Sequence, residues 1–250
     1  MIETRDSSDV RILRLAHGKA NVLDTELFAA LEGALAAAET EAVKAVVLTG
    51  TGNIFSAGVD LYRVVNGGRA YLEEFLPALS LGLLRLFTFS KPVVAAVNGH
   101  AIAGGCVLAC ACDARVGARG SGRIGVPELR VGVPFPAAAL EVVRFTVGDQ
   151  RLSQLVFGGA TYLADEAQAL GLLDHVVDPE NLLDTAISEA QRLSQIEARV
   201  FAFSKRQIRQ QAVETIRRES QQSDSEVLAM WSAPDTQAAI RAYLDATLGR

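Results

Sequence analysis

The chain has 250 residues, of which 50% are hydrophobic and 21% are charged, and its formal net charge at pH 7 is −5. This composition can bury a sizeable core, and the acidic balance argues against a nucleic-acid-binding surface, which would normally be basic. The first six residues lack the apolar region of a signal peptide, and no apolar run reaches the roughly 18 residues needed to span a membrane. We therefore expect a cytoplasmic protein with neither a membrane nor a nucleic acid as partner.

Apolar periodicity predicts alternating strands and helices along the chain. Residues 10–15 alternate apolar and basic side chains and are predicted as a half-exposed strand, and Asp24 can cap a helix that runs to about residue 39. Further strands are expected at 45–48, 93–97, 113–118 and 172–177, and further helices at 71–89, 106–112, 137–145 and over most of the chain from about 150. The order is typical of an α/β domain with a helical appendage. A shift toward Gln, Arg and Glu gives a core of residues 1–190 and a helical region of residues 191–250.

One stretch, residues 91–106, joins a buried strand to a buried helix through glycines. Lys91-Pro92 rules out helix at the start, and the apolar run that follows is typical of a strand buried on both faces. Asn98-Gly99 is expected to end this strand with a positive φ, and Gly104-Gly105 precedes the helix. Such a glycine pair leaves backbone N–H groups free at the positive end of the helix dipole, where they can bind a developing oxyanion. A tight turn in which glycine only avoids a clash is the alternative.

A second loop, Ala57-Gly58-Val59, shares this character, since small residues follow a strand and open a helix. Two backbone donors that converge on one oxygen would make an oxyanion hole. Glu128 follows Pro127 in a short, mostly apolar segment. Its carboxylate is either a surface charge or a base that burial brings to a useful pKa.

Other chemistries find little support in the sequence. The chain has no phosphate-binding loop, no dinucleotide fingerprint and no Gly-x-Ser-x-Gly nucleophile motif. Its three histidines lack metal-ligand spacing, and the three cysteines lie on one predicted helix with no Cys/His cluster beside them. We expect reduced thiols and no metal site.

Several motifs, in order over about residues 10–180, resemble the crotonase family of enoyl-CoA hydratases and isomerases. They are Phe55-Ser56-Ala57-Gly58-Val59-Asp60-Leu61, the stretch from Lys91 to Gly99 with Gly104-Gly105-Cys106, Asp113, Pro127-Glu128, and Ala164-Asp165-Glu166-Ala167 with Gly171-Leu172. The resemblance implies a crotonase-like spiral of ββα units followed by C-terminal trimerisation helices. It also implies an acyl-CoA thioester as substrate, no cofactor beyond the coenzyme A of that substrate, and a homotrimer or a dimer of trimers.

The resemblance carries a set of site residues with it. The backbone N–H groups of Val59 and Gly104 would form the oxyanion hole, and Glu128 would be the catalytic carboxylate. The loop of Lys19 and Ala20 would contact coenzyme A. The remaining predicted substrate-binding residues are Ala57, Asp60, Leu61, Tyr62, Gly105, Val107, Pro127 and Glu141.

Two departures from the family's pattern bear on the reaction. Family hydratases hold a water molecule between two glutamates; Glu128 keeps the second of these positions, whereas the first is occupied by Val107. The family's glycine-rich turn is replaced by Pro-Phe-Pro-Ala-Ala-Ala at residues 134–139, which should reshape the acyl pocket. Glu141, one helical turn further, is either a substitute second acid or a solvated helix charge.

The single glutamate favours one reaction within the family. Without a second carboxylate, adding water to a double bond loses half of its acid–base machinery, about 10²–10⁴ in rate. One base can still move a double bond, so the sequence favours a 3-enoyl-CoA to 2-enoyl-CoA isomerase. An enoyl-CoA hydratase or a related acyl-CoA lyase is the alternative. A non-catalytic acyl-CoA-binding protein is the alternative of another class.

Overall fold

Two β-sheets with helices packed around them make up the fold of this computed structural model, which describes residues 1–248. The larger sheet has the strand order β1-β2-β3-β5-β7-β10. These strands are β1 (Ile2–Ser7), β2 (Val10–Leu15), β3 (Ala45–Thr49), β5 (Val93–Val97), β7 (Ala114–Ala118) and β10 (His175–Val177). Strands β1 and β2 pair antiparallel, and the other neighbours pair parallel.

The smaller sheet shows how the chain repeats itself. It contains, in order, β4 (Ile54–Ser56), β6 (His100–Ile102), β8 (Ile124–Gly125) and β9 (Thr161–Tyr162), and its first three strands are parallel. A strand of the larger sheet, a strand of the smaller sheet and a helix thus recur as β3-β4-α2, β5-β6-α3 and β7-β8-α4. The helices are α2 (Leu61–Phe87), α3 (Gly104–Cys110) and α4 (Glu128–Val131). The predicted spiral of ββα units is confirmed.

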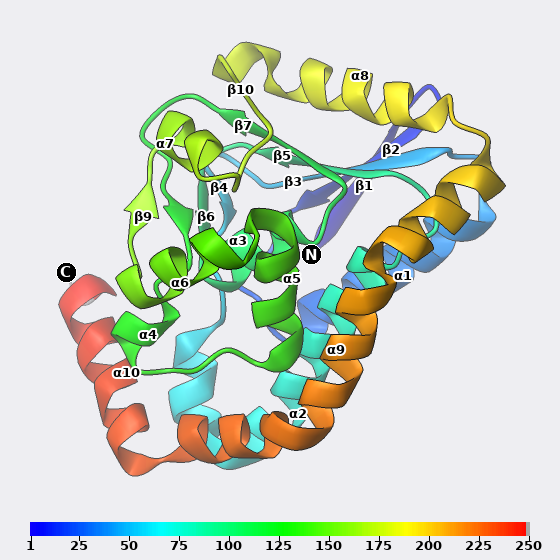
Figure 1. Ribbon diagram of the computed structural model, residues 1–250. Helices are drawn as coiled ribbons and strands as arrows, with labels where there is room; N and C mark the ends of the chain where they lie inside the picture. The colour runs from blue at the N-terminus through cyan, green and yellow to red at the C-terminus, as the bar shows by residue number, and fades with distance from the viewer. Residues whose placement is uncertain (249–250) are drawn as a thin grey trace.

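Side chains of the larger sheet alternate between two apolar cores, because successive residues of a strand point to opposite faces. In β3, Ala45 and Val47 pack in a core with α8 (Leu182–Ser194), whereas Val46 and Leu48 belong to the larger core that includes α1 (Thr25–Thr40) and α2. Figure 1 shows α8 lying along one side of the larger sheet. The predicted cap of α1 is present, since Asp24 Oδ1 accepts a 2.7 Å hydrogen bond from the backbone N–H of Leu27.

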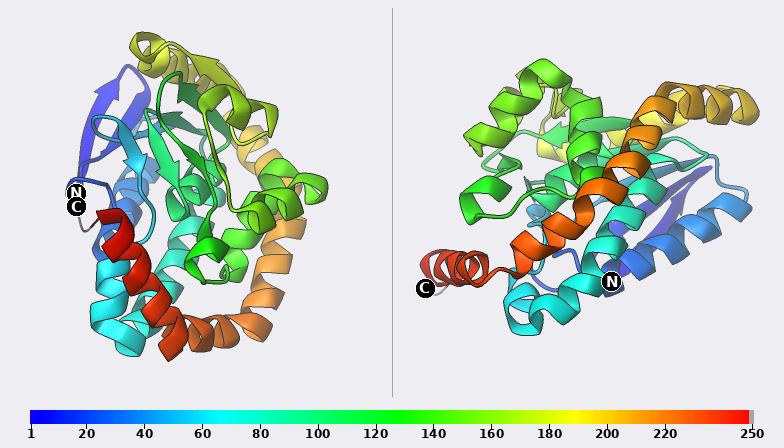
Figure 2. Two further views of the ribbon diagram at one scale, coloured as in Figure 1. Left: turned by 90° about the vertical axis from the view of Figure 1, so that its left-hand side faces the viewer. Right: turned by 60° about the horizontal axis from the view of Figure 1, so that its bottom comes forward.

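The C-terminal part of the chain is helical. After α5 (Ala137–Val147), α6 (Asp149–Gly158), α7 (Ala164–Ala169) and the 3₁₀ turn Pro179–Asn181, the chain forms α8, α9 (Ala198–Ser232) and α10 (Pro234–Leu248). Helix α9 packs against α2 and α5, and α10 contacts α2 and α4. Figure 2 shows α10, in red, beside the cyan first part of α2. The candidate boundary near residue 190 falls inside α8, which packs on the larger sheet.

Two of the expected elements differ from the structure. The helix expected at 71–89 begins ten residues earlier, at Leu61, and is broken at Gly68, whose φ is +55°. The strand expected to be half-exposed, β2, is almost wholly buried. Its Arg11 is only 7% exposed, because Asp6 and Glu41 both accept hydrogen bonds from the guanidinium group.

The turn at Asn98-Gly99 has a different cause from the expected one. Neither residue has a positive φ. Glycine is required there because a Cβ at position 99 would lie 1.8 Å from the carbonyl oxygen of Asn53. The dipeptide therefore marks a close approach of two backbone segments and not a left-handed conformation.

Candidate active site

A cavity of about 330 Å³ lies at the ends of the small-sheet strands. Its walls come from the loop before α1, the first turn of α2, the loop between β6 and α3, the region of α4, and the C-terminal helices. The lining residues are Ala20, Val22, Ala57, Val59, Asp60, Leu61, Tyr62, Ile102, Ala103, Pro127, Glu128, Val131, Val133, Trp231, Tyr243, Leu244 and Thr247. Most of these side chains are apolar, as is usual for a small-molecule site.

The two glycine loops meet at this cavity. A Cβ on Gly58 would lie 2.7 Å from the carbonyl oxygen of Ile102 and 3.3 Å from the backbone nitrogen of Gly104. Leu23 donates to the carbonyl of Gly58 and accepts from the N–H of Asp60, so the N–H of Val59, between them, faces the other way. Among the hydrogen bonds of residues 1–248, none uses the backbone N–H of Val59 or Gly104. Both donors are thus free for an oxygen atom of a ligand.

Ala103, just before the free N–H of Gly104, has a strained backbone. Its φ is +52° and its ψ is −127°, a conformation that residues with a Cβ rarely adopt. Holding it costs of the order of 1–3 kcal/mol, and such strain persists only where the surrounding structure imposes it. Here the hydrogen bond from the Ala103 N–H to the carbonyl of Gly125, 2.8 Å long, fixes the turn that directs Gly104.

A set of hydrogen bonds holds the loop before α1 against the turn that contains Gly58 and Val59. Ser56 Oγ donates to the carbonyl of Asn21 at 2.7 Å and accepts from the N–H of Gly58 at 3.2 Å. The N–H of Ala57 donates to the carbonyl of Ala20 at 3.0 Å. The segment that the resemblance assigns to coenzyme A is therefore fixed to the turn that carries Val59.

Glu128 is the first residue of α4 and lines the cavity from that side. Its Oε2 is inaccessible to solvent and has no hydrogen-bond partner within the described chain. Burial raises the pKa of Glu128 to about 8, and a hydrogen bond from its own backbone opposes this effect only in part. A carboxyl group in such surroundings can take up and return a proton near neutral pH.

Asp60 is the other acidic residue of the lining, and it is already engaged. Its Oδ1 accepts a 3.0 Å hydrogen bond from the backbone N–H of Arg63 and so caps the N-terminus of α2. The cavity therefore holds one unengaged carboxyl group, that of Glu128.

The structure brings most of the predicted site residues together. Those that line the cavity are Ala20, Ala57, Val59, Asp60, Leu61, Tyr62, Pro127 and Glu128. Gly104 adjoins it through its backbone, and Gly105 packs behind it against the Ser56 carbonyl. Val107 is fully buried in the main core, one turn into α3, and Lys19 is exposed on the loop before Ala20.

Glu141 is not brought to this cavity. It lies on α5 and lines a separate cavity between α5 and α9. Its Oε2 accepts a 2.9 Å hydrogen bond from Nε of Arg144, and burial nevertheless raises its pKa. In this structure Glu141 is the partner of Arg144 and does not line the cavity that holds Glu128.

Several of the lining residues were not predicted from the sequence. They are Val22, Ile102, Ala103, Val131, Val133, Trp231, Tyr243, Leu244 and Thr247. The last four come from α9 and α10, so the chain closes its own cavity with its C-terminal helices. The sequence offered one indication that these helices contact a site, namely the single tryptophan of the chain within an otherwise polar helical region.

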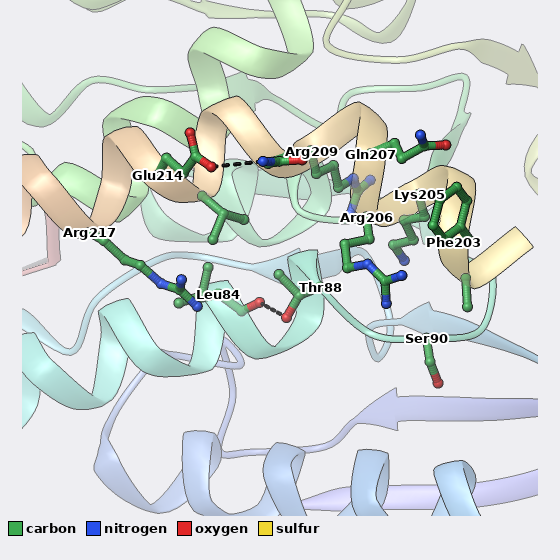
Figure 3. A pocket seen from close by; sticks show the side chains of 13 residues that line it. Leu84, Thr88, Ser90, Phe203, Lys205, Arg206, Gln207, Arg209, Glu214 and Arg217 are labelled. Atoms are coloured by element: carbon green, nitrogen blue, oxygen red, sulfur yellow. Dashed lines mark hydrogen bonds between the residues drawn. The ribbon is translucent and has the colours of Figure 1, made fainter.

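A larger cavity, of about 700 Å³, lies elsewhere. Figure 3 shows it between α2 and α9, with Leu84 and Thr88 on one side and Arg206 and Arg217 on the other. It contains neither a glycine turn nor a buried carboxyl group with a free oxygen. Over residues 1–248, no His, Cys, Asp and Glu side chains cluster as metal ligands would, and no helix is long and apolar enough to cross a membrane. The smaller cavity is the candidate active site.

Comparisons with known proteins agree with this geometry. The family model described as enoyl-CoA hydratase/isomerase matches residues 6–247. The chain is 40% identical over 181 residues to a Thermus thermophilus protein named "Putative enoyl-CoA hydratase", covering 70% of each protein. It is 32% identical over 192 residues to the 2,3-dehydroadipyl-CoA hydratase of Escherichia coli, covering 76% of this chain and 74% of that one.

A solved structure shows the same fold over the whole chain. The human mitochondrial delta3-delta2-enoyl-CoA isomerase superposes with a TM-score of 0.95 at 23% identity, over 99% of this chain and 98% of that one. The fold, the matched family model and the similar relatives lead to one conclusion. The chain belongs to the enoyl-CoA hydratase/isomerase family, the crotonases.

Proposed function

We propose that this member of the family is an enoyl-CoA isomerase that moves the double bond of a 3-enoyl-CoA thioester to the 2-position, with Glu128 as its one acid–base group. The observation that carries the proposal is the lone unengaged carboxyl group of the cavity, next to two free backbone donors. Val107, at the position where a hydratase would carry the first of its two glutamates, is buried in the apolar core.

The reaction can be written with the residues of this chain. The Glu128 carboxylate removes a proton from C2 of the thioester, and the electrons of the broken C–H bond delocalise onto the thioester oxygen and C4. The N–H groups of Val59 and Gly104 stabilise the charge on that oxygen, which is worth about 10²–10³ in rate for each donor. Glu128 then returns the proton at C4, and the double bond lies between C2 and C3. No electron leaves the substrate, so the proposed reaction needs no redox cofactor.

Parallel assays with a 3-enoyl-CoA and a 2-enoyl-CoA test the proposal. Wild-type protein should shift the double bond of the first without hydrating the second. Glu128→Gln should lower the isomerisation rate by about 10²–10⁴-fold, the usual contribution of a general base. Hydration of the 2-enoyl-CoA with no shift of the 3-enoyl-CoA would refute the isomerase.

An enoyl-CoA hydratase, or a related acyl-CoA lyase, is the second candidate, because the relatives named above carry hydratase names. It would need a second acid beside Glu128. The variants Glu141→Gln and Asp60→Asn separate the choices: a hydratase that uses Glu141 loses turnover in the first, and one that uses Asp60 loses it in the second. If both variants keep full hydratase activity, the catalytic groups of the hydratase would be Glu128 and an ordered water molecule.

A non-catalytic acyl-CoA-binding protein is the candidate of another class. Glu128 counts against it, since a binding protein gains nothing from an unpaired buried carboxyl group that costs stability. Tight binding of acyl-CoA thioesters with no turnover of any enoyl-CoA would favour it over both enzymes.

We further propose that the protein assembles as a homotrimer or a dimer of trimers through α9. The support is the exposed apolar surface of that helix, where Val200, Phe203 and Ile208 are each more than half exposed. Such a patch on one helix is typical of an interface. Light scattering should give a multiple of three chains, and a monomer at micromolar concentration would overturn the proposal.

A further inference from the structure

The wall of the candidate active site has an exposed part and a buried part. Tyr62 and Tyr243 are 49% and 38% exposed, whereas Trp231 and Leu244 are 2% and 4% exposed, and all four line the cavity. Val131 and Val133 are buried as well and line the same cavity. A ligand that fills this cavity therefore meets the buried indole of Trp231 and the buried side chain of Leu244.

Hydrogen bonds fix the buried part of the wall in place. Trp231 Nε1 donates a 2.9 Å hydrogen bond to the carbonyl of Pro134, in the segment that replaces the family's glycine-rich turn. Gln237 Nε2 donates to the carbonyl of Trp231 at 2.7 Å, and Arg241 Nη2 donates to the carbonyl of Val65 at 3.1 Å, which ties α10 to α2. The N–H of the indole is thus used up, so Trp231 offers no polar hydrogen to a ligand.

The lining offers no positive charge. Asp60 and Glu128 are the ionisable acidic side chains of this cavity within residues 1–248, and no Lys, Arg or His lines it. An acyl chain that ended in a carboxylate would be desolvated against Trp231 without a cation to pair with it. Burying an unpaired charge is far more costly than burying a methyl group.

We propose that Trp231 and Leu244 set the specificity of this site, so that it accepts short apolar acyl groups and rejects long chains and chains with a terminal carboxylate. The inference rests on the proposed function, because it takes the cavity to hold the acyl group of a CoA thioester. The volume of the cavity is in line with a short acyl group, because about 330 Å³ is near the lower end of the range for ligand pockets.

The test compares kcat/KM for 3-hexenoyl-CoA, 3-dodecenoyl-CoA and 3-hexenedioyl-CoA, the last of which adds a terminal carboxylate. Wild-type protein should prefer hexenoyl-CoA over each of the others by at least about tenfold. Trp231→Ala should raise the dodecenoyl-to-hexenoyl ratio by at least about tenfold without helping the dicarboxylate. Met230→Ala is the matched control, because Met230 is its neighbour on α9 but is exposed and does not line the cavity.

Two further measurements keep the inference separate from the proposed function. Leu244→Ala removes less buried surface than Trp231→Ala and provides the same readout if the tryptophan variant does not fold. Calorimetric binding of saturated hexanoyl-CoA and dodecanoyl-CoA needs no turnover. If the protein binds the shorter acyl-CoA more tightly but isomerises neither 3-enoyl-CoA, the proposed isomerase function is refuted and the inference about Trp231 and Leu244 is retained. Isomerisation with an unchanged length ratio in both variants, or equal acceptance of the dicarboxylate, would overturn the inference alone.

Discussion

The buried carboxyl group of Glu128 should make the stability of this protein depend on pH. Its pKa is raised from an ordinary 4.5 to about 8 in the folded state. Between these pH values the unfolded chain loses the proton while the folded chain keeps it, so stability falls as pH rises, by about 1.4 kcal/mol for each pH unit. The interval between the two pKa values corresponds to about 5 kcal/mol, which is a large part of the 5–15 kcal/mol of a typical domain.

Glu128→Gln removes the titration and keeps the shape of the side chain. We expect the variant to gain stability relative to wild type as pH rises from 5 to 8.5, by a few kcal/mol in total, with no further gain above that pH. Urea unfolding at a series of pH values measures the difference. Glu74→Gln, at an exposed position of α2, controls for the loss of a carboxylate as such. A difference between Glu128→Gln and wild type that stays constant over this range would refute the burial of an uncharged Glu128.

Three further substitutions probe the backbone and the buried charges. Gly105→Ala should lower both stability and activity severely, since its Cβ would lie 2.2 Å from the carbonyl oxygen of Ser56 and α3 would have to move, as thermal unfolding and the isomerase assay would report. Asp113→Asn should cost about 3–5 kcal/mol in urea unfolding, because Lys205 Nζ, 2.7 Å from Asp113 Oδ2, would keep a buried charge without its partner. Ala103→Gly should raise the unfolding temperature, because relief of about 1–3 kcal/mol of strain exceeds the roughly 0.5–1 kcal/mol that glycine costs in chain entropy; a lower temperature would contradict the strain.

The sequence was a good guide to the parts of the fold that have a local cause. The apolar runs at β3 and β5 predicted buried strands, and the position of Asp24 predicted the cap of α1. Arg11 was misplaced because its burial depends on Glu41, which is 30 residues away in the chain. Gly99 was explained wrongly for the same reason, since the backbone that it must admit belongs to Asn53.

The residues of the candidate site also differ in whether their positions have a local cause in the sequence. Motif resemblance pointed to the glycine turns and Glu128, whose spacing from the strands is fixed along the chain. It did not point to Trp231 or Leu244, because their approach to the cavity depends on the direction in which α10 leaves α9. The positive φ of Ala103 had no signal in the sequence either, since a residue with a Cβ rarely adopts this conformation.

The order of the strands explains why these groups meet. Val59, Gly104 and Glu128 follow the ends of β4, β6 and β8, which are adjacent and parallel, so the three ββα units deliver them to one edge of the small sheet. The first two units supply backbone N–H groups, which depend on the turn and hardly on the side chain. The third supplies a side chain. Because the oxyanion donors belong to the backbone, the side chain of Glu128 is the part of this arrangement that a single substitution can remove without altering the two turns.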